Sequence, residues 1–95
     1  MLIETPYKNG DTITIKTLTE EIVARLVEET DTTVKVHKPL AIMTTQQGLG
    51  LGPFAFTISP DADVVLNKSV IFMIAKTEKE MASQYTQNTT GLTIV

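Results

Sequence analysis

One histidine and two nearby aspartates are the side chains best suited to chemistry in this chain of 95 residues. His37 is the only histidine, and Asp61 and Asp63 form an Asp-x-Asp pair farther along. Two close carboxylates can bind a hard cation, and an imidazole can act as a base or as a ligand. However, the Ser-Pro-Asp around Asp61 also has the composition of a turn. A small metal-dependent enzyme using these three residues is therefore an alternative that we do not favour.

The stretch GLGLGPFAF, residues 48–56, is a second candidate, because glycine-rich loops can bind phosphate. A phosphate loop needs a Gly-Lys-Ser/Thr sequence or a strand-loop-helix order, so that backbone N–H groups converge on the ligand. Here Gly52 is followed by Pro53 and a predicted strand, and the loop has no lysine. We predict a mobile loop that leads into a strand, with no catalytic residue, no metal and no cofactor.

Charge and composition exclude several classes of protein. The net charge of −3 argues against a strong phosphate-binding surface, and the absence of cysteine excludes thiolate chemistry and disulfides. The acidic pairs Glu20-Glu21 and Glu28-Glu29 are interpreted as solvated positions. No secretory leader pattern is present, and the longest apolar run, residues 70–75, is too short to cross a membrane. We expect one cytoplasmic domain without a membrane partner.

The composition favours strands over helices. Roughly one residue in six is threonine, and valine and isoleucine are also frequent. Such β-branched side chains are stiff and suit a pleated surface. Alternating apolar residues separated by turn signals predict strands over residues 11–18, 33–44 and 54–58, and an unbroken apolar run predicts a strand over residues 69–76. Pro39, which cannot donate a backbone hydrogen bond, marks a bulge, a bend or an edge position in the second of these.

Residues 20–29 fit two periods. Ile22, Val23 and Leu26 would lie on one face of a helix, whereas a strand would place Ile22, Ala24 and Leu26 on one side. We favour a strand, because the short turn at residues 30–32 is typical of a link between antiparallel neighbours.

The period changes after the last predicted strand. Thr77 and Glu80 have the spacing of a capping box, and Met81 and Tyr85 lie one turn apart. These signals predict a helix over residues 78–88 that ends near Gly91. The sequence leaves open whether the apolar tail after it packs against a neighbour.

Two segments carry a resemblance to a known family. LTEEIVARLVEETDTTVKV, residues 18–36, resembles the first motif of the Sm-like (Lsm) superfamily, and LNKSVIFMI, residues 66–74, resembles the second. The whole chain is most similar to short Sm-like proteins encoded by marine cyanophages. The resemblance implies a small, five-stranded, strongly bent antiparallel sheet or open barrel of the Sm-like and SH3-like type over residues 1–76. Residues 77–95 would add the C-terminal helix and tail.

The same resemblance implies a non-enzymatic scaffold or binding module that forms a cyclic homo-oligomer of about five to seven copies. A phage-encoded chain would act in the cytoplasm of its bacterial host. The fourth and fifth predicted strands carry almost no charge, so we expect them to pair between copies. The expected interface residues are Phe54, Phe56, Ile58, Val70, Phe72 and Ile74.

RNA is a weaker candidate partner. The turn positions that would contact it are Asp31, Thr32, Thr33, Asn67 and Lys68, and the cations that could support it are Arg25, Lys35, Lys38 and Lys68. Family members that bind uridine-rich RNA carry an Asp-x-x-x-Asn turn in the first motif and Arg-Gly in the second. Here the first turn lacks the asparagine, and Asn67-Lys68 stands at the Arg-Gly position. The other alternative is a phage structural or assembly component that acts through protein–protein contacts.

Overall fold

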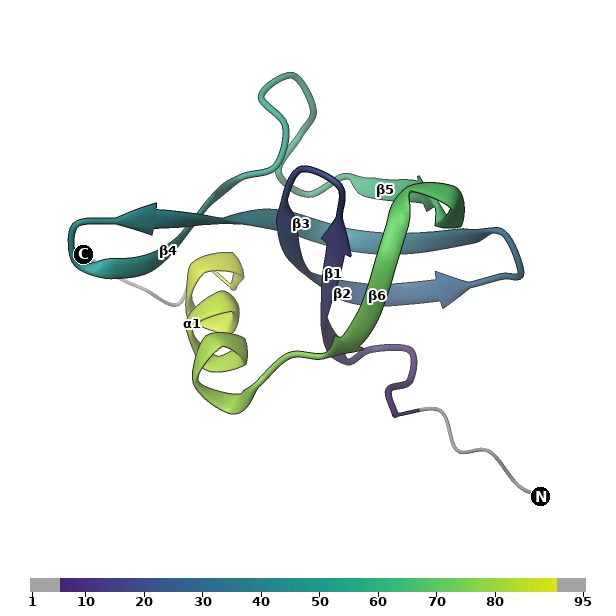
Figure 1. Cartoon of the computed structure of the whole chain (residues 1–95), viewed down its shortest axis with the longest axis horizontal. Helices are drawn as coiled ribbons and strands as arrows, with labels where there is room; N and C mark the ends of the chain where they lie inside the picture. Colours follow the sequence, from purple (N-terminus) through teal and green to yellow (C-terminus); the bar gives the residue numbers. More distant parts are fainter. Residues whose placement is uncertain (1–5, 91–95) are drawn as a thin grey trace.

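The computed structural model of the chain describes residues 6–90 as a mainly β antiparallel sheet of six strands with one C-terminal helix (Figure 1). A single 3₁₀ turn, η1 (Lys68–Val70), separates the last two strands. The other elements are β1 (Thr12–Thr17), β2 (Glu21–Glu29), β3 (Thr33–Thr45), β4 (Gly48–Pro53), β5 (Asp63–Asn67), β6 (Ile71–Lys76) and α1 (Lys79–Thr89).

The strands follow the order β4-β3-β2-β1-β6, and β5 lies beside β3 as well. Residues 40–45 of β3 pair with β4, whereas residues 33–37 pair with β5. Within the described residues the sheet is neither closed nor strongly curled, so the expected strongly bent sheet or open barrel is not the form observed. The count of five strands was also too low, since the sheet has six.

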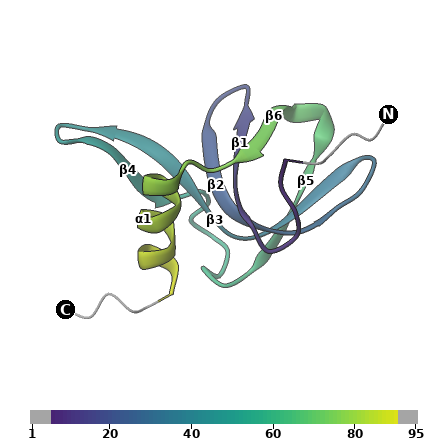
Figure 2. The same ribbon diagram turned by 90° about the horizontal axis from the view of Figure 1, so that it is seen from below.

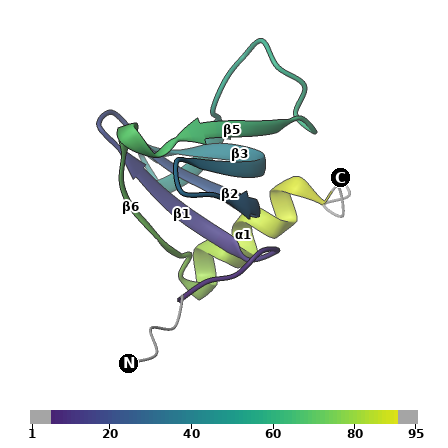
Figure 3. The ribbon, with the colours of Figure 1, turned by 90° about the vertical axis from the view of Figure 1, so that its right-hand side faces the viewer.

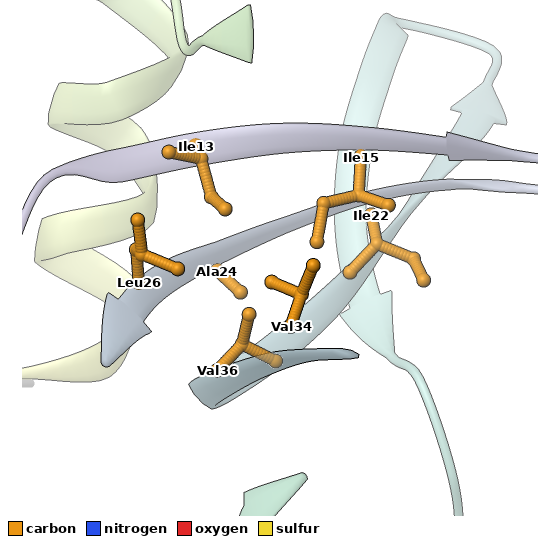
Figure 4. Close-up of a cluster of buried hydrophobic side chains, with 7 residues drawn as sticks. All are labelled: Ile13, Ile15, Ile22, Ala24, Leu26, Val34 and Val36. Atoms are coloured by element: carbon orange, nitrogen blue, oxygen red, sulfur yellow. The ribbon is translucent and has the colours of Figure 1, made fainter. Parts of the chain in front are cut away.

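The main core lies on one face of β1, β2 and β3 (Figure 4). It consists of Ile13, Ile15, Ile22, Ala24, Leu26, Val34 and Val36, all of which are buried. Because alternate strand residues share a face, these side chains come from a strict period of two. Residues 21–29 therefore form a strand as favoured, and the helical interpretation is wrong. The inward residues of β5 and β6, Val64, Leu66, Ile71 and Ile74, pack against this cluster.

A second, smaller contact lies on the opposite face of the sheet, where α1 packs against β2 (Figure 3). Val23 points to this face, between the core residues Ile22 and Ala24, and is buried, as is Tyr85 of α1. Thr14 and Thr77 share a hydrogen bond of 2.9 Å between their hydroxyl oxygens. The helix therefore covers part of the second face of the sheet.

The expected irregularity near Pro39 is confirmed as a bulge. The pairing of β2 with β3 shifts register between Val23 and Arg25, opposite residues 37–40. Lys38 has a φ of 52°, which side chains other than glycine seldom adopt. The bulge shifts the side-chain alternation, so that Pro39 and Ala41 are buried while Leu40 is only half-buried.

The glycine stretch is a strand, and our prediction of a loop there is wrong. Gly48–Pro53 pairs with β3, with Gly50 opposite Met43 and Gly52 opposite Ala41. A Cβ atom at Gly52 would clash with the sulfur of Met43, so the methionine side chain occupies the space that the glycine leaves. Gly48 has a φ of 117° and closes the turn into the strand. Because glycine and leucine alternate, the glycines lie on one face of β4 and the leucines on the other.

Residues 54–58, which we expected to form a strand, lie in the connection from β4 to β5. Both sides of β3 are already occupied, by β2 on one side and by β4 and β5 on the other, so these residues do not pair with β3. The turn expected at Ser59-Pro60-Asp61 is confirmed, because the Ala62 N–H donates to the Ser59 carbonyl oxygen over 3.0 Å. The strand expected over residues 69–76 is shorter, because η1 occupies its start.

The C-terminal helix is confirmed, one residue later than predicted, but its cap is Glu78 and not Thr77. A carboxylate oxygen of Glu78 accepts from the Met81 N–H over 2.7 Å. Thr77 instead stays with the sheet, where its backbone N–H donates to the Thr12 carbonyl oxygen. The expected stop at Gly91 and the apolar tail lie outside the described residues. In the described part of the chain, no helix is long and apolar enough to cross a membrane.

Candidate functional site

The two turn segments proposed for RNA contact lie side by side. The backbone N–H of Lys68 donates to the carbonyl oxygen of Thr32 over 2.9 Å, and Thr33 stands opposite Asn67 in the ladder of β3 and β5. Asn67 caps η1, since its side-chain oxygen accepts from the Ser69 N–H over 2.9 Å. The structure therefore brings Asp31, Thr32, Thr33, Asn67 and Lys68 to one end of the sheet, which we call the turn cluster.

The charge of the turn cluster is largely compensated. The Lys68 ammonium lies 2.8 Å from a carboxylate oxygen of Glu29. The hydrogen bond from Lys68 is the main cause that lowers the pKa of Glu29, and a hydrogen bond from Tyr7 acts in the same direction. Burial, followed by the interaction with Glu29, raises the pKa of the Tyr7 phenol. Because Asp31 adds a further negative charge, the cluster offers no net positive charge to a phosphate.

The remaining candidate cations do not join Lys68. Lys35 stands opposite Glu28 in the ladder of β2 and β3, and Arg25 stands opposite His37. The Lys38 ammonium donates to the Thr89 carbonyl oxygen at the end of α1 over 2.7 Å. Arg25 and Lys35 therefore lie beside other side chains of β2 and β3, and Lys38 contacts the end of α1.

The structure brings His37 and Asp63 together and gives Asp61 a different partner. His37 Nδ1 lies 2.6 Å from Asp63 Oδ1, because the two residues are opposite each other on β3 and β5. Asp61 Oδ1 lies 3.6 Å from the Lys38 ammonium. Over residues 6–90, no three histidine, aspartate or glutamate side chains lie close enough to share a metal ion. The expected three-residue metal set is therefore not assembled.

A small cavity of about 190 Å³ lies beside these ion pairs, between the bulge in β3, the connection after β4 and the end of α1. Its lining is mainly apolar, from Pro39, Phe54, Ile58 and their neighbours, with Lys38 and Asp61 at its polar side. Sites for small molecules usually enclose about 300–1,000 Å³, so this cavity is too small for most cofactors. It also lacks an arrangement of nucleophile and base.

Of the six residues expected at an oligomer interface, two pack against the main core and four are exposed. Phe54 and Ile74 pack against the main core, whereas Ile58 and Val70 are exposed. Phe56 and Phe72 are the most exposed aromatic residues, with 85% and 67% of their surface accessible. Phe72 and its exposed neighbour Met73 belong to β6, which pairs only with β1 among the described strands.

The roles of three residues at these surfaces, Tyr7, Glu29 and Val65, were not predicted from the sequence. Glu29 was interpreted as solvated, but it is half-buried between Lys68 and Tyr7. Val65 points outward from β5, a strand that was not predicted. The short apolar run of Val64, Val65 and Leu66 after the turn was the signal available for that strand. No signal along the chain indicated the contact between Tyr7 and Glu29.

No protein-family model matches the chain, and no curated protein shows significant similarity to it.

Proposed function

We propose that this chain is a non-enzymatic scaffold or binding module of the Sm-like kind, which assembles into a ring. Because residues 54–58 form no strand, β5 of one copy takes the place of the fourth predicted strand and pairs with β6 of the next copy. The observation that supports the proposal is that β6 has an open, uncharged edge. This strand has an unpaired side in the described fold, exposes Phe72 and Met73, and contains no charged residue from Ile71 to Ala75. Edges of this kind are normally covered or charged.

The alternation of side chains on the two strands is compatible with the register that sets Val65 opposite Met73. Val65 and Met73 both point outward, whereas Val64 and Ile74 both pack toward the main core. An antiparallel pairing that sets Val65 opposite Met73 therefore sets Val64 opposite Ile74, and both pairs keep their faces. Because the two edges differ, the contact is heterologous, and such contacts close into rings when the rotation between copies permits.

The experiment is a cross-link through this register, in a chain that has no cysteine of its own. We expect the double variant Val65→Cys/Met73→Cys to form a ladder of disulfide-linked oligomers that ends at the ring, with about five to seven copies expected. A control that shifts one partner, Val65→Cys/Phe72→Cys, moves that thiol by one residue and should cross-link less. Monomers only, in both variants, would contradict the proposal.

A second test uses solution mass. We expect Phe72→Lys to abolish ring assembly, because it places a charge on the pairing edge. Leu18→Lys is the matched control, since Leu18 is equally exposed but lies in the turn between β1 and β2. Light scattering on a sizing column measures both variants, and an unchanged mass for Phe72→Lys would count against the role of β6.

A further inference from the structure

The hairpin of β4 and the adjoining half of β3 (residues 40–53, here called the arm) extends away from the body of the fold (Figures 1 and 2). β4 pairs with β3 on one side only, and no other described strand pairs with its second side. Leu49 and Met43 of the arm have 60% and 45% of their surface exposed. The arm therefore presents a second open backbone edge, on a different strand from the edges of the proposed ring.

No charged residue protects that edge, although Pro53 stands at its end. From Pro39 to Pro60 the sequence has no charged residue, although 20% of the whole chain is charged. Proteins usually guard an open edge with lysine or another charge. The tip carries Gln46 and Gln47, whose amides are costly to place in hydrocarbon but compatible with strand pairing in water. These features favour a protein strand as the occupant over a membrane.

The order of residues on β4 makes the strand complementary to itself. We infer that β4 pairs antiparallel with β4 of a second copy, about a two-fold axis at Gly50. This register sets Leu49 of each copy opposite Leu51 of the other, on the same face. The glycines share the opposite face, where Met43 already covers Gly52. Because the segment is uncharged, the two copies meet without like charges opposite each other.

This contact is independent of the proposed ring. A two-fold contact uses the same surface on both copies and stops at a dimer, whereas pairing of β5 with β6 uses two different surfaces. If both contacts form, the arms of one ring join those of a second ring, and the assembly is a pair of rings. Each contact can therefore be lost without the other.

A single cysteine tests the axis directly. In Gly50→Cys, the two thiols would face each other across the two-fold axis. A Cβ atom at this position has only the Thr45 methyl group within 3.3 Å, so the substitution fits after a small movement of that side chain. Gln46→Cys is the control, because its thiols would be separated by about 25 Å along the paired strands at about 3.4 Å per residue. We expect mild oxidation to link Gly50→Cys into dimers and to leave Gln46→Cys largely unlinked. Equal cross-linking of both variants would overturn the inference.

A charge on the edge provides the second test. We expect Leu49→Lys to halve the solution mass, whereas Phe72→Lys alone should leave a dimer. An unchanged mass for Leu49→Lys, together with no cross-link in Gly50→Cys, would overturn the arm contact while leaving the ring untouched. Binding of the wild-type chain to phosphatidylcholine vesicles, lost in Leu49→Lys, would also overturn it, because the edge would then serve a membrane.

Discussion

The hydroxyl group of Tyr85 donates to the carbonyl oxygen of Lys38 over 2.8 Å. The carbonyl oxygen of His37 lies 3.0 Å from the same hydroxyl. Lys38 is the residue with a φ of 52° that forms the bulge in β3, so one buried phenol connects α1 to the irregular point of the sheet. Burial raises the pKa of this phenol, and the nearby Arg25 opposes the shift.

Removal of this hydroxyl should destabilise the fold. Tyr85→Phe keeps the ring but leaves the buried carbonyl oxygens without their donor, so we expect the free energy of unfolding to fall by about 1–3 kcal/mol. Urea denaturation measures the change, and Ser83→Ala on the exposed side of α1 is the control. Equal stability of Tyr85→Phe and the wild type would show that the hydroxyl does not anchor the helix.

The backbone at Lys38 offers a comparison of two substitutions. Lys38→Ala and Lys38→Gly both remove the ammonium contacts with Thr89 and Asp61. Only glycine adopts a positive φ without steric cost, so we expect the glycine variant to be about 1 kcal/mol more stable than the alanine variant. Denaturant midpoints of the two proteins test this, and a more stable alanine variant would mean that the bulge is absent in solution.

The pair of Glu29 and Lys68 should make stability depend on pH. The folded protein lowers the pKa of Glu29 below 4.5, so the ionised form stabilises the fold above that value. The contribution is lost as the pH falls through the lowered pKa. We expect Glu29→Gln to be less stable than the wild type at pH 7 by no more than about 1 kcal/mol, because the pair is partly solvated.

Thermal unfolding of the wild type and of Glu29→Gln, measured from pH 7 to about pH 2, gives the difference between their stabilities at each pH. It should shrink toward zero at the acidic end. Glu28→Gln, on the exposed neighbour, is the control for a general effect of charge. If the difference in stability stayed constant over this pH range, the ionised form of Glu29 would not be its cause.

The turn cluster should bind uridine-rich RNA weakly or not at all. Its cation, Lys68, is paired with Glu29, and the whole chain has a net charge of −3. We expect no saturation with an oligouridine by fluorescence anisotropy at physiological salt. Saturable binding that weakens steeply with salt, and that Lys68→Ala abolishes, would instead make RNA the leading candidate partner.

Individual predictions show which sequence signals depend only on neighbouring residues along the chain. The period of two at Ile13 and Ile15 indicated a strand, and the short turn at residues 30–32 favoured a strand at Ile22, Ala24 and Leu26, where the period alone also fitted a helix. These five residues do belong to the core. The change of period after residue 77 likewise predicted α1 within one residue. In both cases neighbouring positions along the chain carry the information, because alternation and helical spacing are properties of one segment.

Pairing between distant segments decided the rest. Residues 48–53 became a strand and residues 54–58 did not, because β3 offers an edge to the first and none to the second. In the same way, Thr77 lost the helix cap to Glu78 because Thr14, far away in sequence, takes its hydroxyl. The sequence by itself determined a mainly β domain with a terminal helix. Only the tertiary structure decided which edges stay open, since an edge is defined by the strands that do not pair with it.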